Sequence, residues 1–177
     1  MKKLLVITSL FLVGCSSVPP GNVGVVVNPL GNERGVEDQQ LNTGIHFIAP
    51  WKTVYLFPIF EQNVTWVERG DTNYAFNFQT CEGMAVGCDI GITFHLKPTA
   101  IPMIFQKYRS GISEITNVFV KNYVRDAINR AASKMQIEDL YGLGKEAFFN
   151  DVETSVRNDL SPIGIETKDE VVFLIHS

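Results

Sequence analysis

The repeat period of the apolar side chains changes near Lys97-Pro98. Before that point the apolar residues form short runs or alternate with polar ones, as between Tyr74 and Gln79, which is the period of a β-strand. After it they recur every three or four residues, which is the period of an amphipathic helix. Alternation returns from Ile165 to Ile175. Strands first, helices next and one closing strand predict an α+β domain with a mostly antiparallel sheet and two main helices.

Runs of β-branched and aromatic residues bounded by Gly, Pro or Asn predict the strands before the switch. These strands are expected over residues 21–28, 43–51, 53–60, 62–69, 74–79 and 84–96. The segment 30–42 is polar and carries glycines, so we expect a loop there. Glu82-Gly83 predicts a two-residue turn between the last two strands.

Two main helices are expected after the switch, preceded by a short helix from Lys97 to Phe105. Ser113 is a suitable N-cap for the first, which runs to about Met135. The second covers about Lys145 to Leu160 and is ended by Pro162 and Gly164. The first helix is expected to bury Val120, Val124, Ala127, Ile128, Ala131 and Met135. The second is expected to bury Phe149, Val152, Val156 and Leu160.

The chain opens with the pattern of a secretory signal, in which Lys2 and Lys3 precede an apolar run that ends in small residues before Cys15. The run is about ten residues long, whereas a membrane-spanning helix needs about twenty. Leu12-Val13-Gly14-Cys15 resembles the bacterial lipobox, in which the signal is cut before a cysteine whose sulfur carries a diacylglycerol. We therefore expect a lipoprotein signal peptide over residues 1–14 and acyl chains such as palmitate on Cys15. The alternative is an ordinary signal peptide that ends near a cysteine.

Residues 15–20 are expected to form a lipidated anchor and a short spacer, because Ser16 to Pro20 is polar and proline-containing. Stable anchoring takes more than one acyl chain, a condition that a triacylated cysteine meets. No later segment approaches eighteen apolar residues, so we expect no second membrane element. Ser16 in place of Asp resembles the outer-membrane sorting preference of enteric bacteria. The anchored chain is expected to face the periplasm or the cell exterior.

The charge balance excludes some classes of partner. Of the 177 residues, 45 % are apolar and 19 % are charged, with a net charge of −4. This composition permits a real core, and no Lys/Arg cluster indicates a nucleic-acid-binding surface. Cys81 and Cys88 would lie about 13 Å apart if a two-residue turn joins their strands, at ~3.3 Å per residue. A disulfide needs Cα atoms within about 7 Å, so we expect none unless the loop is wider.

No catalytic, cofactor-binding or metal-binding residue is predicted. The three histidines lie in predicted strands or at the chain end, away from any nucleophile elbow: His46, His95 and His176. Three carboxylates lie at strand ends and turns, where solvation is the default: Glu68, Asp71 and Glu82. Gly142-Leu143-Gly144 lacks the strand and the lysine of a phosphate loop. Five aromatic residues suit either the core, which we favour, or the lipid headgroup level: Trp51, Tyr55, Phe57, Phe60 and Trp66.

Several motifs together resemble the SPFH domain, also called Band 7, of stomatin, prohibitin, flotillin and HflK/HflC. The first is the strand Val23–Val27, followed by the glycine-containing segment Thr43–Pro50. The second is Thr80-Cys81-Glu82-Gly83 with the later Lys97-Pro98, where Glu82 replaces the usual Asp. The third motif is Tyr123-Val124-Arg125-Asp126-Ala127, which places an arginine within the amphipathic helix. The fourth is Ile163-Gly164-Ile165, between the last helix and the closing strand.

The resemblance covers about Pro20 to Ile175 and implies an SPFH domain over residues 21–177, of the short lipoprotein form found in bacteria and phages. Relatives usually continue into a long charged coiled-coil helix, whereas this chain stops at Ser177. The resemblance implies a non-enzymatic, homo-oligomerising membrane scaffold that modulates partners such as membrane-bound AAA proteases. We place the self-association surface on the outer face of the helix 113–135 and on exposed sheet edges.

Two other functions remain open. One is a monomeric, periplasm-facing binding lipoprotein or a phage-encoded exclusion factor, which the missing coiled-coil helix favours. The other is a lipid-anchored hydrolase, for which the sequence supplies no recognisable nucleophile.

Overall fold

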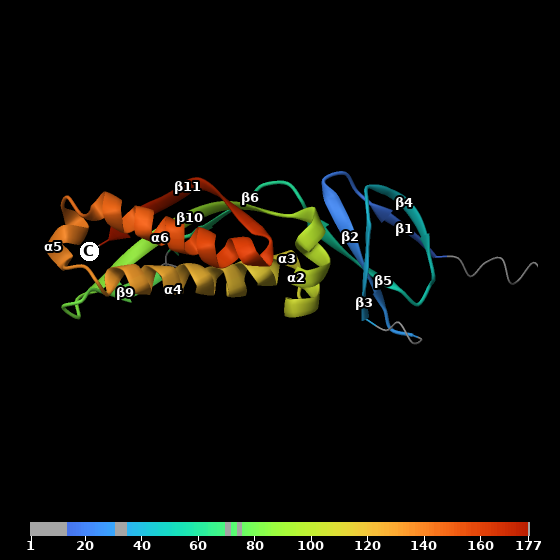
Figure 1. Cartoon of the computed structure of the whole chain (residues 1–177), viewed down its shortest axis with the longest axis horizontal. Coiled ribbons are helices and arrows are strands. Elements are labelled where there is room, and N and C mark those ends of the chain that lie inside the picture. Colours follow the sequence, from blue (N-terminus) through green and yellow to red (C-terminus); the bar gives the residue numbers. More distant parts are fainter. Residues whose placement is uncertain (1–13, 31–34, 70–71, 74–75, 177) are drawn as a thin grey trace, which may run out of the picture. The chain divides into compact units, whose positions relative to one another are not determined.

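The computed structural model describes residues 14–30, 35–69, 72–73 and 76–176 (Figure 1), so the expected signal peptide lies outside the described residues except for Gly14. The chain divides into two compact units, each built from two stretches of sequence. Unit 1 contains residues up to Phe60 together with Pro98–Ile112, and unit 2 contains Glu61–Lys97 together with the residues from Ser113 onward. Strands and helices are both abundant, which confirms the predicted α+β class.

Unit 1 is built from two small antiparallel sheets. The three-stranded sheet has the order β3-β2-β5, and the two-stranded sheet pairs β1 with β4. Their bounds are β1 Gly14–Val18, β2 Asn22–Asn28, β3 Gly35–Leu41, β4 Gly44–Ile48 and β5 Thr53–Pro58. The prediction of a loop over residues 30–42 was wrong for β3. Its residues, GVEDQQL, are mostly polar and show no apolar alternation. This fits an edge strand, because β2 is its one partner among the described residues.

Strand β2 is the centre of unit 1, and its residues Val23 to Val26 are buried. Helix α2 (Ile101–Tyr108), preceded by the 3₁₀ turn η1 (Pro98–Ala100), packs against β2 and β3. The Phe105 ring of α2 lies 4.6 Å from the Tyr55 ring and 5.9 Å from the Phe57 ring. Side chains at alternate positions face the other side, where Val18 of β1 approaches Gly24. Both faces of β2 are therefore covered.

Strand β1 occupies the place where the sequence predicted a spacer. It pairs antiparallel with β4, with Gly14 opposite Ile48, Cys15 opposite Phe47 and Ser17 opposite Ile45. Residues up to Val18 are therefore a strand where an anchor and spacer were predicted; Pro19 follows β1, and Pro20-Gly21 form the turn into β2. The strand was missed because its residues, GCSSV, are small and polar, and their extended form depends on a partner more than twenty residues away.

Unit 2 is organised on the long strand β10 (Ala85–Leu96). On one edge β10 pairs with β11 (Ile165–His176), and on the other with β6 (Gln62–Trp66) and β9 (Phe76–Gln79), all antiparallel. The strand predicted over 62–69 ends earlier, and a separate short hairpin of β7 (Glu68–Arg69) and β8 (Thr72–Asn73) follows. The first two residues of the strand predicted over 74–79 lie outside the described residues.

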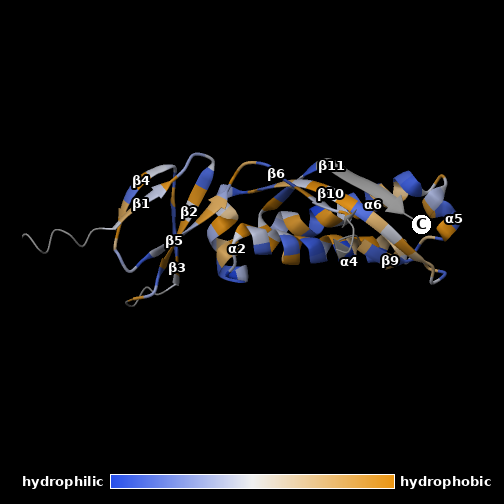
Figure 2. Cartoon of the chain, turned by 180° about the vertical axis from the view of Figure 1, so that it is seen from behind, coloured by the Kyte–Doolittle hydropathy of each residue, from blue (hydrophilic) through white to orange (hydrophobic). Residues whose placement is uncertain are grey.

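The helices of unit 2 lie against this sheet, and α4 and α6 run side by side (Figure 1). Residues 112–132 form one continuous helical run made of α3 (Ile112–Glu114), the π-helix η2 (Ile115–Val120) and α4 (Lys121–Ala132). Then follow α5 (Ile137–Tyr141), α6 (Lys145–Leu160) and the 3₁₀ turn η3 (Ser161–Ile163). The helix predicted over 145–160 is confirmed. Figure 2 shows apolar and polar patches alternating along α4 and α6, as expected for amphipathic helices.

The predicted apolar stripe of the first main helix is confirmed from Val120 to Ala131, whereas Met135 beyond its end is half-buried. One residue of the second stripe was wrong. Phe148, rather than Phe149, is buried, because it stands four residues before Val152 and so shares its face of α6. The Phe148 ring stacks on Phe78 of β9 with 5.8 Å between centroids. This contact fastens α6 to the sheet.

A surface ion-pair cluster joins β10 to β11. Glu166 stands opposite His95, and its carboxylate lies 2.7 Å from Lys97 Nζ and 3.0 Å from His95 Nε2. The hydrogen bond from Lys97 contributes most to lowering the pKa of Glu166 below its ordinary value of 4.5. Desolvation opposes this shift, and the charge of Lys97 and the neighbouring His95 add to it. The ionised carboxylate is therefore the form that the folded chain favours.

The close approach at Gly24 predicts a destabilising substitution. A Cβ at this position would lie 2.9 Å from Val54 Cγ1 and 3.2 Å from both Leu41 Cβ and Val18 Cγ2. Gly24→Ala should therefore lower the free energy of unfolding by about 1–3 kcal/mol, the usual cost of overpacking. Denaturant unfolding followed by circular dichroism measures this change. Gly111→Ala is the matched control, because a Cβ there meets nothing within 4 Å; equal effects of the two variants would contradict the packing argument.

The lowered pKa of Glu166 predicts a pH-dependent contribution to stability. A carboxyl group whose pKa is lower in the folded state stabilises the fold above its unfolded pKa. That contribution is lost as the pH falls through the folded pKa. Glu166→Gln should therefore lower the melting temperature at neutral pH, and the difference from the unsubstituted chain should shrink below pH 4.5. A difference that stays constant down to the acid limit of folding would show that Glu166 acts through packing instead.

Candidate functional site

The predicted lipid-attachment residue, Cys15, is the second residue of the paired strand β1 and is exposed. Directly opposing residues of an antiparallel pair project to the same face, so Cys15 shares its face with Phe47, and Ser17 shares it with Ile45. We call this set of four residues the outer face of the β1–β4 sheet. All four are exposed, and Phe47 and Ile45 keep 78 % and 69 % of their surface accessible.

The other face of the same sheet, its inner face, is more polar and less exposed. Ser16 stands opposite His46 there, and both are half-buried. The ring Nε2 of His46 donates a hydrogen bond of 2.6 Å to the carbonyl of Asn42. Val18 is buried on this side. Ile48 is half-buried on this side as well, opposite Gly14. Strand β4 therefore exposes Ile45 and Phe47 and half-buries the polar His46 between them, which reverses the usual alternation at these three positions.

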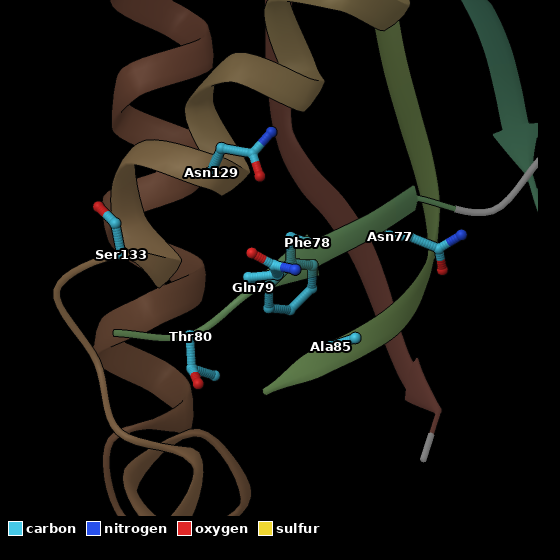
Figure 3. Close-up of a pocket in the computed structure, with 7 residues that line it drawn as sticks. All are labelled: Asn77, Phe78, Gln79, Thr80, Ala85, Asn129 and Ser133. Carbon is cyan, nitrogen blue, oxygen red and sulfur yellow. The ribbon is translucent and has the colours of Figure 1, made fainter. Parts of the chain in front are cut away.

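A second candidate site is a groove in unit 2, between β9 and α4 (Figure 3). Its volume is about 550 Å³. Asn129 of α4 and Ser133, the residue that follows α4, line one side. The rest of the lining comes from β9, the residue after it and the start of β10: Asn77, Phe78, Gln79, Thr80 and Ala85. Asn77 and Gln79 are exposed and Phe78 is buried, so the lining includes both faces of β9. The groove therefore passes around the edge of this strand.

The end of the groove near Thr80 is held by hydrogen bonds. Met84 N donates to Thr80 Oγ1 at 3.3 Å, and Cys81 N donates to the carbonyl of Met135 at 3.1 Å. Glu82 accepts a 3.2 Å hydrogen bond from Ile137 N, at the start of α5. These bonds tie the turn between β9 and β10 to the segment after α4. The turn is wider than the predicted two residues, because Gln79 pairs with Ala85.

A basic pair lies on α4 beside β9. Arg125 Cζ and Lys121 Nζ lie 6.0 Å and 5.5 Å from the centre of the Phe76 ring. Partial burial and then the charge of Arg125 lower the pKa of Lys121. Arg125 is exposed and donates a 3.4 Å hydrogen bond to Asn122 Oδ1. Two cations one helical turn apart repel each other, and both are placed over the Phe76 ring.

The groups considered for catalysis are not brought together where the structure describes them. His46 is bound to a backbone carbonyl in unit 1, and His95 pairs with Glu166 in unit 2. Glu82 serves the start of α5, while Asp71 and the side chains of Glu68 and His176 lie outside the described residues. No disulfide joins Cys81, which is exposed, to Cys88, which is buried in β10. Within the described ranges no group of three or more His, Cys, Asp or Glu side chains is placed to hold a metal ion.

The predicted aromatic residues divide between the core and the surface. Phe57 and Trp66 are buried, whereas Trp51, Tyr55 and Phe60 keep about half of their surface accessible, at 52 %, 42 % and 55 %. The sequence did not single out Ile45 and Phe47, although their alternation with His46 was readable. The groove residues carried no signal, since they become neighbours only when α4 packs on β9. Across the residues that the structure describes, no helix combines the length and the apolar character needed to cross a bilayer.

Comparison with known proteins places this architecture in a family. Residues 16–171 match the model of the SPFH domain / Band 7 family. A curated protein of Mycobacterium tuberculosis named Protease Rv3090 is 24 % identical over 112 residues, which are 63 % of this chain and 37 % of that protein. The chain therefore spans little more than a third of the length of this relative. The family is membrane-associated, and its members are typically scaffolds or modulators of proteases rather than enzymes. Because the family model covers most of the sequence, the chain belongs to the SPFH domain / Band 7 family.

Proposed function

We propose that this chain is a lipoprotein anchored through Cys15 that acts as an oligomerising membrane scaffold or as a modulator of membrane proteins or proteases. Family membership supports the scaffold role, because SPFH proteins are membrane-associated and typically self-associate. The exposed thiol of Cys15, preceded by the lipobox-like Leu12-Val13-Gly14, supports the anchor. The proposed location is a bacterial membrane, with the domain facing the periplasm or the exterior and the outer membrane favoured.

Anchoring strengthens a weak contact between copies by confining them to one surface. Confinement raises the effective concentration of neighbouring copies, so that an interface too weak for solution can still form oligomers. We place this interface on the exposed face of α4, which carries Arg125 and Asn129, and on the open edge of β9 beside it. An exposed strand edge offers unpaired backbone groups to a partner. Both elements belong to unit 2.

A hydrolytic function receives no support from the described residues. The name of the mycobacterial relative describes that protein, and the similarity covers only part of it. A hydrolase of the serine or cysteine type needs a nucleophile within hydrogen-bond reach of a base. The two histidines whose side chains are described bind other groups: His46 binds the Asn42 carbonyl, and His95 binds the Glu166 carboxylate. We therefore do not propose catalysis.

The groove favours a second candidate function, a monomeric binding lipoprotein or phage-encoded exclusion factor that holds one partner. Its lining of amides and hydroxyls at a strand edge suits an extended peptide, because such a peptide can add main-chain hydrogen bonds to the sheet. The basic pair Lys121 and Arg125 would favour an acidic segment. The scaffold would form a large lipidated particle, whereas the binding lipoprotein would be a monomer, so the particle mass distinguishes the two functions.

The anchor predicts a specific mass. The mature protein extracted from membranes should begin at Cys15 and carry acyl chains, and Cys15→Ala should lose both the processing and the added mass. Intact-mass spectrometry of the detergent-extracted protein measures this. Cys81→Ala is the matched control, because Cys81 is also an exposed cysteine. A wild-type mass without acyl chains would overturn the anchor.

The scaffold predicts a particle that persists on dilution. The lipidated chain in mild detergent should scatter light as a large particle across a dilution series, and Arg125→Glu should reduce the particle mass. The fold should survive, since the introduced carboxylate would pair with Lys121 one turn away. Lys145→Glu makes the same charge change at the start of α6 and should leave the mass unchanged. A wild-type monomer at every dilution would favour the binding lipoprotein. An unchanged particle in Arg125→Glu would remove α4 from the interface.

A further inference from the structure

The outer face of the β1–β4 sheet has the composition of a buried surface but is exposed. Phe47 and Ile45 project from it, whereas the less exposed inner face carries Ser16 and His46 together with Val18 and Ile48. Neither strand contains a charged residue, as the sequences GCSSV and GIHFI show. An exposed apolar surface of this kind marks a place where another apolar medium is met.

The residue proposed to carry the lipid stands in this same face. Cys15 lies directly opposite Phe47, and opposing Cα atoms of an antiparallel pair are about 4.5–5.5 Å apart. Ile45 follows two residues along β4, on the same side of the sheet. Acyl chains bonded to Cys15 would therefore leave the protein beside Phe47 and Ile45, with no spacer between them.

We propose that the outer face of the β1–β4 sheet docks on the surface of the lipid bilayer, with Phe47 and Ile45 inserted next to the acyl chains of Cys15. This inference rests on the anchor proposed above. The absence of charge on both strands supports it, because charged groups resist entry into a bilayer. Trp51, which is 52 % exposed in the turn after β4, is of the residue type enriched at the membrane–water boundary.

The size of the face favours a bilayer over a second protein. Each strand has five residues and is about 16 Å long, and two paired strands are about 10 Å wide, so the face covers ~160 Å². A standard protein interface buries about 800 Å² on each partner. A bilayer requires no such area, because the acyl chains already supply the attachment. Docking of this face then turns a loose tether into a fixed orientation of unit 1 on the membrane.

Tryptophan fluorescence tests the proposal at residue 47. Two full-length, lipidated variants share the change Trp51→Phe, so that buried Trp66 is their common background. One adds Phe47→Trp and the other adds Leu143→Trp, at an apolar residue of unit 2 that is 104 % exposed. Each is reconstituted into phosphatidylethanolamine–phosphatidylglycerol vesicles that contain phosphatidylcholine brominated near the headgroup or deep in the acyl chain. The acyl mass of each variant is confirmed by mass spectrometry.

If the face docks on the bilayer, the emission of the tryptophan at position 47 should shift to shorter wavelength and be quenched by the shallow bromine. The emission of the tryptophan at position 143 should neither shift nor be quenched. Acylated protein in which both positions stay unquenched would overturn the docking and leave the anchor intact. A blue shift at 47 without lipid quenching, lost on dilution, would assign the face to a second copy and overturn the proposal. Protein without acyl mass would overturn the anchor, and this inference with it.

Discussion

The pairing of β10 with strands on both of its edges is the constraint on which unit 2 depends. β10 is the one strand in the described ranges that joins β11, β6 and β9 into a single sheet. Its residues Ile90, Ile92, Phe94 and Leu96 are at most 1 % exposed. Burying a side chain of this size contributes about 1.5–3 kcal/mol each. Without β10, β6 and β9 would lack hydrogen-bond partners and the helices α4 and α6 would lack a surface to cover.

The candidate groove is a consequence of this arrangement. β9 pairs with β10 only, so one of its edges has no strand beside it among the described residues. Phe78 packs inward on Phe148, which places the backbone of β9 at a fixed distance from the helices. Asn129 of α4 and Ser133, the residue after α4, then line the groove beside this edge. Strand β9 thus contributes Phe78 to the core and, at the same time, leaves one edge open beside the groove.

Local sequence pattern predicted the elements whose character is set by their own residues. The helix over residues 145–160 and the strand β10 were both found, because each carries a long and regular apolar period. The fold class and the SPFH resemblance were found as well. The strands β1 and β3 were missed, because GCSSV and GVEDQQL are extended through pairing with β4 and β2 and not through their own preference.

The candidate sites were predictable only in part, for the same reason. Cys15 stands in a local motif and could be identified without a structure. Its neighbours Phe47 and Ile45 become neighbours through the register of β1 on β4, which depends on residues far apart in the sequence. The groove likewise needs α4 to pack on β9. The sequence therefore predicts the proposed attachment point, whereas the surface around it becomes visible only in the fold.

An attachment point and a docked face have different consequences for assembly. A copy held only by a flexible tether can rotate, so it presents a given side to its neighbour for a small fraction of the time. A unit 1 fixed through Cys15, Phe47 and Ile45 loses that rotational freedom once, when it meets the bilayer. A later contact between copies then costs less orientational entropy, because the orientation of each copy is already restricted. In the proposed docking, the reversed alternation of β4, which leaves Phe47 exposed while His46 is half-buried, would therefore also favour the proposed assembly.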